Sequence, residues 1–444
     1  MNQADVSGTI RPSATSIQQR TPTTGIHSIL GRRGRIAFYY LYVAFTLGAA
    51  ATLLIPQSEE ERGSNLIFSI AWASMHVISG IIFLGFKRHP KAQVSIVAII
   101  GAYIIASSAW SASPRDTFVY GSMVAGNIAT AYMIARDLSP REIMLMSARI
   151  ILVLAVGGMV SGLLGYSQAL YFDAHDRPTV VGTQPIRGFF NHKITASLYA
   201  TLGVIACLAC YRNSKRVLSM LCLGFFVILT GSSTGLVIFP TSIALFYLLN
   251  FIRRVRGEKA ARGVALAGII AASVIVGVLS ANIDIILASL GRDPTLTGRT
   301  LLWEWGMQTW MQRPALGWGF NGYFNGPNAS AISDAIKSFE NYNVPHFHQS
   351  YIQTAVDLGV PGLLILAAVQ FSIVTRAWHR MRSNIPDAGA ETLTLMSVIF
   401  IASLTMFIFI TYNHFVTLIM FTLYFSLRHP SLDTDRSPRI RHAE

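Results

Sequence analysis

Long apolar stretches alternate with short polar segments along most of this chain. A helix that crosses a membrane needs roughly 20 mostly apolar residues. Twelve stretches approach that length, and they begin near Ile36, Leu66, Ala92, Thr117, Ile143, Ile194, Val217, Gly235, Val264, Tyr351, Thr392 and Ile410. The pattern predicts an all-α fold, namely a polytopic membrane protein of about 12 transmembrane helices.

Composition agrees with this pattern. The chain is 52% hydrophobic and only 13% charged, whereas soluble domains average about 25% charged residues. A net charge of +14 is compatible with binding to nucleic acid. However, the basic residues lie in short clusters between apolar stretches, as they do in membrane proteins, so nucleic acid is not an expected partner.

The positions of these basic clusters predict the orientation of the chain. With a cytoplasmic N-terminus, 26 of the 35 Lys and Arg residues fall on the cytoplasmic side, including every cluster. An odd number of spans would break this separation. We therefore expect both termini to be cytoplasmic, with residues 1–35 as a disordered tail, 36–427 as the membrane domain and 428–444 as a second tail.

Two long segments, 166–193 and 284–349, fall on the outer side, where connections of this length are usually functional. We expect the second to contain short helices. Thr297 is a suitable cap for one that runs from Gly298 to about Gln312 and ends before Pro314. In that helix Trp303 shares a face with Met307 and Trp310, which suits the membrane interface.

His346 and His348 close the second outer segment, and they are the first candidates for chemistry. The unperturbed pKa of histidine lies near neutral pH, so His348 is a candidate general base and His346 a residue that orients it. The alternative is a hydrogen-bonded interface histidine. We predict no metal site, because no third ligand stands at a recognisable spacing from this pair.

Two outer arginines are candidates for binding an anion. Arg299 falls in the first turn of the expected loop helix, where free backbone N–H groups and a guanidinium favour phosphate. A solvated arginine, or one paired with Glu304, is the alternative. Arg187 and Lys193 lie beside a span on the outer side, against the orientation rule. An anionic ligand is one explanation and chance is another.

Several of these segments together resemble one known family. The segments are Trp110-Ser-Ala-Ser-Pro114, Arg187-Gly-Phe-Phe-Asn-His-Lys193, Gly298-Arg-Thr-Leu-Leu-Trp303, Pro314-Ala-Leu-Gly-Trp-Gly319 and the stretch from His346 to Gly362. In order and spacing they are similar to the O-antigen ligase and Wzy-type polymerase superfamily, and nearest to its exopolysaccharide-polymerisation branch. The chain departs from the family pattern at Gln349, where Asn is usual, and at Asp357, where Glu is frequent.

The resemblance implies a metal-independent glycosyltransferase in the bacterial inner membrane that needs no cofactor. Its donor would be a glycan on undecaprenyl diphosphate at the periplasmic face, and its acceptor a glycan or a lipid-linked molecule. By motif match His348 would activate the acceptor hydroxyl, and Arg299 and Arg187 would hold the diphosphate. His346, Gln349, Lys193 and Trp303 would support them. Membrane lipids, and other polysaccharide-export proteins, would be further partners.

Four functions stay open at this point. The favoured one is polymerisation of repeat units into exopolysaccharide or O-antigen. The nearest alternative is an O-antigen ligase, which transfers the finished glycan to lipid A core or another acceptor. A transporter of lipid-linked sugar predicts inverted repeats, and none is visible. A non-catalytic scaffold predicts that replacing His348 is harmless.

Overall fold

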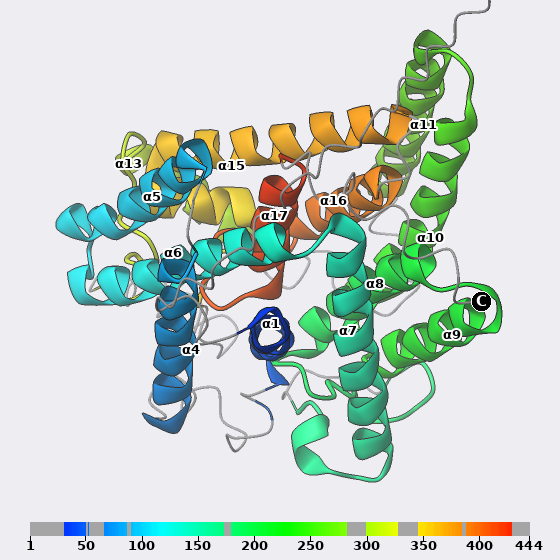
Figure 1. The fold of residues 1–444 in the computed structure, drawn as a ribbon, viewed down its shortest axis with the longest axis horizontal. Helices are drawn as coiled ribbons and strands as arrows, with labels where there is room; N and C mark the ends of the chain where they lie inside the picture. Colours follow the sequence, from blue (N-terminus) through cyan, green and yellow to red (C-terminus); the bar gives the residue numbers. More distant parts are fainter. Residues whose placement is uncertain are drawn as a thin grey trace, which may run out of the picture.

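The computed structural model describes residues 31–49, 52, 66–86, 90–172, 179–281, 299–326, 345–383 and 388–428. Across these ranges the chain is helical, with a single isolated antiparallel bridge between Leu170 and Ile186. The helices, shown in Figure 1, are α1 (Arg32–Thr46), α4 (Leu66–Leu84), α5 (Lys91–Ala106), η1 (Ser107–Trp110), α6 (Pro114–Asp137), α7 (Pro140–Leu163), η2 (Ser167–Ala169), α8 (Lys193–Cys210), α9 (Asn213–Leu229), α10 (Ser233–Arg254), α11 (Glu258–Ala281), α13 (Arg299–Gln312), α15 (Ser350–Arg382), α16 (Gly389–Ser403) and α17 (Phe415–Ser426).

The prediction of a polytopic helical membrane protein is confirmed. Each of the twelve apolar stretches contains a helix. Among the described residues, seven helical segments are long and apolar enough to cross a membrane: α4, α5 with η1, α6, α7, α8, α10 and α15. The count of twelve crossings stays a prediction. The expected tails fall mostly outside the described residues, as do 284–298 and 327–344 of the large outer segment.

Local sequence explains how individual helices begin. At the start of α7 the hydroxyl of Ser139 accepts a hydrogen bond from the N–H of Glu142, and the Glu142 carboxylate accepts one from the N–H of Ser139. This capping box, with Pro140 at the first helical position, satisfies N–H groups that have no partner inside the helix. The expected loop helix is also present, since α13 begins at Arg299 and ends at Gln312.

The packing centre is α17, in which every residue from Phe415 to Ser426 is buried. Figure 1 shows α17 surrounded by α6, α7, α15 and α16. A partly buried ion pair joins α1 to the end of α6: the Nε atom of Arg35 lies 2.7 Å from Oδ2 of Asp137, which also accepts from the hydroxyl of Tyr39. Removing either charge would leave the other one poorly compensated.

The segment between α16 and α17, residues 404–414, is not helical, so the twelfth predicted stretch contributes a helix only from Phe415 onward. Ile410 and Asn413 adopt positive φ angles of 47° and 52°. Because backbone groups without partners are costly at membrane depth, side chains bind some of them. The hydroxyl of Ser350 donates to the carbonyl of Met406 and accepts from the N–H of Ile408.

Helix α15 breaks at Gly359, which has a φ of 61°. A Cβ atom at Gly359 would lie 2.6 Å from the carbonyl oxygen of Ala315, so this close approach requires glycine. Pro361 lacks an N–H and cannot continue the hydrogen-bond ladder. The N–H of Val360 donates instead to the carbonyl of Pro314, at 2.9 Å, and the first turns of α15 thereby attach to the turn that follows α13.

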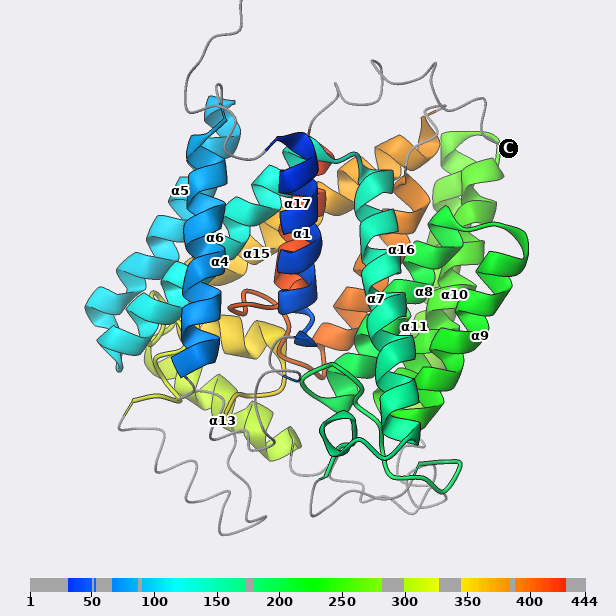
Figure 2. The same ribbon diagram turned by 60° about the horizontal axis from the view of Figure 1, so that its bottom comes forward.

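That turn, residues 313–320, also binds the segment that follows η1. The N–H of Ala112 donates to the carbonyl of Trp318, and the indole of Trp110 donates to the carbonyl of Leu316. Two of the sequence segments singled out above, 110–114 and 314–319, are thus neighbours in space. Figure 2 shows α13 and the loop around η2 at one end of the helical bundle, while the basic end of α15 lies at the other.

Candidate functional site

The sequence His346-Phe347-His348 forms a tight turn directly before α15. The N–H of His348 donates to Nδ1 of His346 at 3.2 Å, and the two imidazole rings lie 4.2 Å apart, centroid to centroid. His348 has a φ of 52°, which is uncommon for a residue other than glycine. Between them Phe347 is fully buried, with its ring 4.8 Å from that of Phe324. The buried phenyl anchors the turn that carries both histidines.

The turn determines which ring nitrogen of His346 carries the proton. Because Nδ1 of His346 accepts a hydrogen bond, the neutral ring must carry its proton on Nε2. Burial lowers the pKa of His346 to about 4, and the charge of Arg299 also lowers it. Burial likewise lowers the pKa of His348 well below 6.5, followed by the charges of His346, Arg299 and His192. Both rings are therefore neutral at pH 7, and His348 is able to accept a proton.

The imidazole of His348 is available for a substrate. In the part of the chain that the structure describes, neither of its ring nitrogens hydrogen-bonds to protein. His346, by contrast, has one nitrogen occupied by the turn and the other protonated, so it is a donor. Of the two histidines, His348 is the one that fits a base.

Arg299, the first residue of α13, is near enough to these histidines for its charge to lower the pKa of both. Its Nη1 atom donates to the carbonyl of Thr405 at 3.1 Å. The ring of Phe407, in the same non-helical segment, contacts the ring of His346 at 5.5 Å between centroids. The start of α13, the histidine turn and residues 404–414 thus meet at one place, with a guanidinium at the helix terminus where anions are favoured.

The role of Arg187 in binding the diphosphate stays a prediction, and the contacts seen for Arg187 are with its own loop. It is buried, and its guanidinium donates to the backbone carbonyls of Gln168, at 3.0 Å, and Asn191, at 3.3 Å. Lys193 begins α8, with its ammonium 5.2 Å from the centre of the Tyr171 ring. These contacts hold together the loop that precedes α8.

That loop contributes His192, which the sequence analysis did not assign. Its Nδ1 accepts from the N–H of Ile194, capping α8, and its Nε2 lies 2.7 Å from the hydroxyl of Tyr171. The charge of His192 lowers the pKa of His348. This effect on the pKa of His348 indicates that the loop around 187–193 lies near the histidine turn. The available signal was a histidine immediately before an expected helix start, inside a segment already singled out.

The remaining two predicted residues are Gln349 and Trp303. Gln349 caps α15, with its side-chain oxygen accepting from the N–H of Ile352 at 2.7 Å. Trp303 lies one turn after Arg299 on α13, half-buried, and its indole N–H has no partner among the described residues. The expected common face with Met307 and Trp310 is divided: Met307 is exposed, whereas Trp310 packs on the cluster around Phe347. The position of this face at the membrane interface stays a prediction.

A second polar group that sequence reasoning missed lies deeper, at the start of α17. Nδ1 of His414 accepts from the N–H of Val416, and Nε2 lies 3.0 Å from the hydroxyl of Tyr199 on α8. The amide of Asn127 on α6 donates to the carbonyl of His414. These bonds satisfy the polar groups at the end of the non-helical segment and connect three helices.

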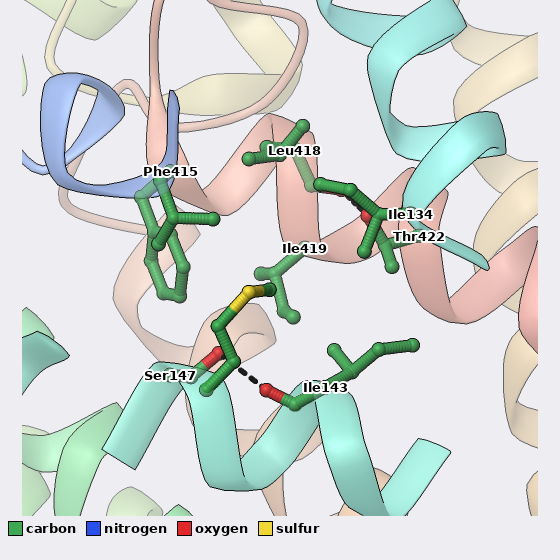
Figure 3. Close-up of a pocket in the computed structure, with 9 residues that line it drawn as sticks. Ile134, Ile143, Ser147, Phe415, Leu418, Ile419 and Thr422 are labelled. Carbon is green, nitrogen blue, oxygen red and sulfur yellow. Dashed lines mark hydrogen bonds between the residues drawn. The ribbon is translucent and has the colours of Figure 1, made fainter. Parts of the chain in front are cut away.

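One hollow between α1, α6, α7 and α17 is not suited to a glycan or a diphosphate. Figure 3 shows its lining, which is apolar except for Ser147 and Thr422. Both hydroxyls donate within their own helices, to Ile143 and Leu418. This hollow is a packing gap, and the polar groups gather instead around His348. Within the described ranges, no three His, Cys, Asp or Glu side chains come together as a metal site.

Two comparisons with known proteins bear on this arrangement. Residues 218–367 match the family described as O-antigen ligase, a range that includes α13, the histidine turn and the start of α15. The chain is also similar to the exopolysaccharide production protein ExoQ of Rhizobium meliloti (strain 1021), with 27% identity over 310 residues. That similarity covers 65% of this chain and 66% of the relative.

Proposed function

Because this chain belongs to the O-antigen ligase and Wzy-type polymerase superfamily, we propose that it polymerises oligosaccharide repeat units carried on undecaprenyl diphosphate. The product would be an exopolysaccharide or O-antigen, made at the periplasmic face of the bacterial inner membrane. We place twelve helices across that membrane with both termini in the cytoplasm. The observation that carries the proposal is the ring of His348, which forms no hydrogen bond to protein within the described residues and lies near enough to Arg299 for its charge to lower the pKa of His348.

In the proposed reaction, an acceptor hydroxyl oxygen attacks the anomeric carbon of the donor sugar. The bond from that carbon to the phosphate oxygen breaks, and its electron pair leaves with undecaprenyl diphosphate. His348 takes the hydroxyl proton, which raises the nucleophilicity of the oxygen. Arg299 and the N-terminus of α13 stabilise the charge on the departing diphosphate. His346, protonated on Nε2, supplies a further hydrogen-bond donor at the same place.

The roles of the other residues follow from their contacts. Arg187 and Lys193 hold the loop that brings His192 toward His348, and in this proposal Arg187 acts on the diphosphate through that loop. Gln349 fixes the start of α15. Trp303 lies one turn from Arg299 and offers an aromatic surface for a sugar or a lipid headgroup.

A deletion strain that expresses His348→Ala tests the proposal, with the protein level in the membrane measured alongside. His379→Ala is a matched control, because His379 is an exposed histidine near the other end of α15. We expect long polymer to disappear and lipid-linked single repeats to accumulate with His348→Ala alone. Long lipid-linked chains without transfer to an acceptor would identify a ligase instead. Unchanged polymer would reject the catalytic role and favour a scaffold or a transporter.

A further inference from the structure

Two polar side chains, Gln353 and Asp357, are fully buried in the first turns of α15. They lie four residues apart, on one face of the helix. The side-chain nitrogen of Gln353 donates to Oδ1 of Asp357 at 3.1 Å. The backbone of Asn321, in the turn after α13, forms a hydrogen bond with the same carboxylate. Buried polar groups need such partners, but an apolar pair would fill the same space without them.

Gln353 connects this pair to the histidine turn. The side-chain oxygen of Gln353 accepts from the N–H of Phe347 at 3.0 Å. An amide side chain can be turned either way, and its neighbours decide which way it points. The backbone N–H of Phe347 can only donate, so it binds the carbonyl of Gln353, and Oδ1 of Asp357 accepts from the NH₂ group at the other side of the same amide. Both partners thereby favour the same orientation of the amide, with its carbonyl toward the peptide between the two histidines.

We propose that Gln353 and Asp357 are positioning residues that hold His346 and His348 in place through the N–H of Phe347. The inference rests on the proposed function for its catalytic consequence, although the contacts themselves do not depend on it. The peptide that Gln353 binds leads directly into the positive φ of His348. A backbone held in this sparsely populated region needs its surroundings to fix it. Through Asn321, the same carboxylate also ties the turn to the glycine-rich segment after α13.

The variant Gln353→Met keeps the volume of the side chain and removes the acceptor for Phe347. Asp357→Asn keeps the shape of the side chain but replaces one oxygen with an NH₂ group. That NH₂ group must then face either the NH₂ group of Gln353 or the backbone of Asn321, and both of these donate to the carboxyl group in the unaltered protein. Gln93→Met is the matched control, because Gln93 is also a buried glutamine, on α5 and outside the site. Each variant is purified as the full chain in detergent, and its thermal unfolding is compared with that of the unaltered protein.

Two independent measurements decide the proposal. The first is hydrogen–deuterium exchange in the peptide that covers residues 345–349. We expect faster exchange in Gln353→Met and Asp357→Asn and no change in Gln93→Met. The second is the kinetics of polymer formation from lipid-linked repeats. We expect kcat to fall on the order of 10- to 100-fold with KM nearly unchanged, since a small misplacement of a catalytic group costs that much. The double variant should lose no more than either single one.

Each outcome tests the positioning role of Gln353 and Asp357 independently of the proposed polymerisation reaction. Unchanged exchange in both variants would show that the pair does not hold the turn, whatever the activity. Faster exchange with an unaltered kcat would show that the turn needs no positioning. A lower yield of folded protein with normal exchange and kcat would mean a purely structural pair. If His348→Ala itself keeps full polymer output, the proposed function fails, while exchange still reports whether Gln353 holds Phe347.

Discussion

The backbone N–H of His348 donates to Nδ1 of His346, 3.2 Å away, and this bond gives the two histidines different chemistry. It leaves His346 with a proton on Nε2 and thus makes it a donor. His348 keeps both ring nitrogens unbonded to protein within the described residues. The same bond stabilises the positive φ of His348, so tautomer and backbone conformation are fixed together.

A pair of substitutions at His346 separates these two effects. Asn places an amide oxygen near the position of Nδ1 and keeps an acceptor for His348, whereas Gln places an amide nitrogen near Nε2 and loses that acceptor. Because the acceptor holds the turn, we expect His346→Asn to retain on the order of 10 times more kcat than His346→Gln. Polymer formation by purified protein in liposomes measures this. Equal loss in both variants would show that the bond to His348 is not what matters.

The pH dependence of the reaction should follow the lowered pKa of His348. A base must be neutral, so kcat/KM falls only as the pH drops through the pKa of His348, which burial places well below 6.5. We expect no acid loss between pH 7 and 6.5. Removing the neighbouring positive charge with Arg299→Gln should raise that pKa and move the acid limb to higher pH, besides lowering the maximal rate.

Arg313→Gln serves as the comparison for Arg299→Gln, because Arg313 lies just after α13 with its guanidinium over the ring of Trp318. Its removal should leave the acid limb in place. A limb that does not move in Arg299→Gln, or that moves equally in both variants, would contradict the electrostatic coupling between Arg299 and His348.

Substitutions at Arg187 should act on stability as well as on the reaction. Arg187→Met removes the hydrogen bonds from the guanidinium to the carbonyls of Gln168 and Asn191, and a bond to a charged group contributes about 1.5–3 kcal/mol. We therefore expect a lower unfolding midpoint by differential scanning fluorimetry, and a raised KM for the lipid-linked donor as the loop loosens. Arg187→Lys should restore little of the unfolding midpoint or of the KM, because lysine is a point charge and lacks the planar guanidinium group.

The control for Arg187→Met is Arg115→Met, an exposed arginine at the start of α6. It should change neither quantity. A raised KM in Arg187→Met with an unaltered midpoint would favour direct contact of Arg187 with the diphosphate. A lower midpoint with an unaltered KM would reduce Arg187 to a structural residue.

The sequence predicted most of the helices because each has a composition that only a membrane or a buried core tolerates. It also predicted a helix from Gly298 to about Gln312, close to the bounds of α13, since capping and proline signals are local. It did not predict that residues 404–414 are non-helical, because their apolar composition is the same in either conformation. That choice depends on distant partners such as Ser350, which binds the backbone on both sides of Phe407.

For the site, too, local features could be predicted from the sequence and features that depend on distant contacts could not. The short segments around His348 and Arg299 were recognisable, and Arg299 lies near enough to His348 for its charge to lower the pKa of that histidine. The contacts of Arg187 and His192 could not be predicted from their positions in the sequence, because these contacts depend on the fold of the loop before α8. A guanidinium next to a span looks the same in sequence whether it faces a ligand or the carbonyls of its own loop.

The short length of α17 has a consequence for how the protein is made. Twelve residues extend only about 18 Å, and a bilayer core is about 30 Å thick. In the predicted twelve-span topology the remaining depth falls to residues 404–414, whose backbone is bound by side chains from α15 and α17 itself. Lipid supplies no such partners. On that topology we expect this last segment to complete its insertion only after α15 and α8, which bind it, are already in the membrane.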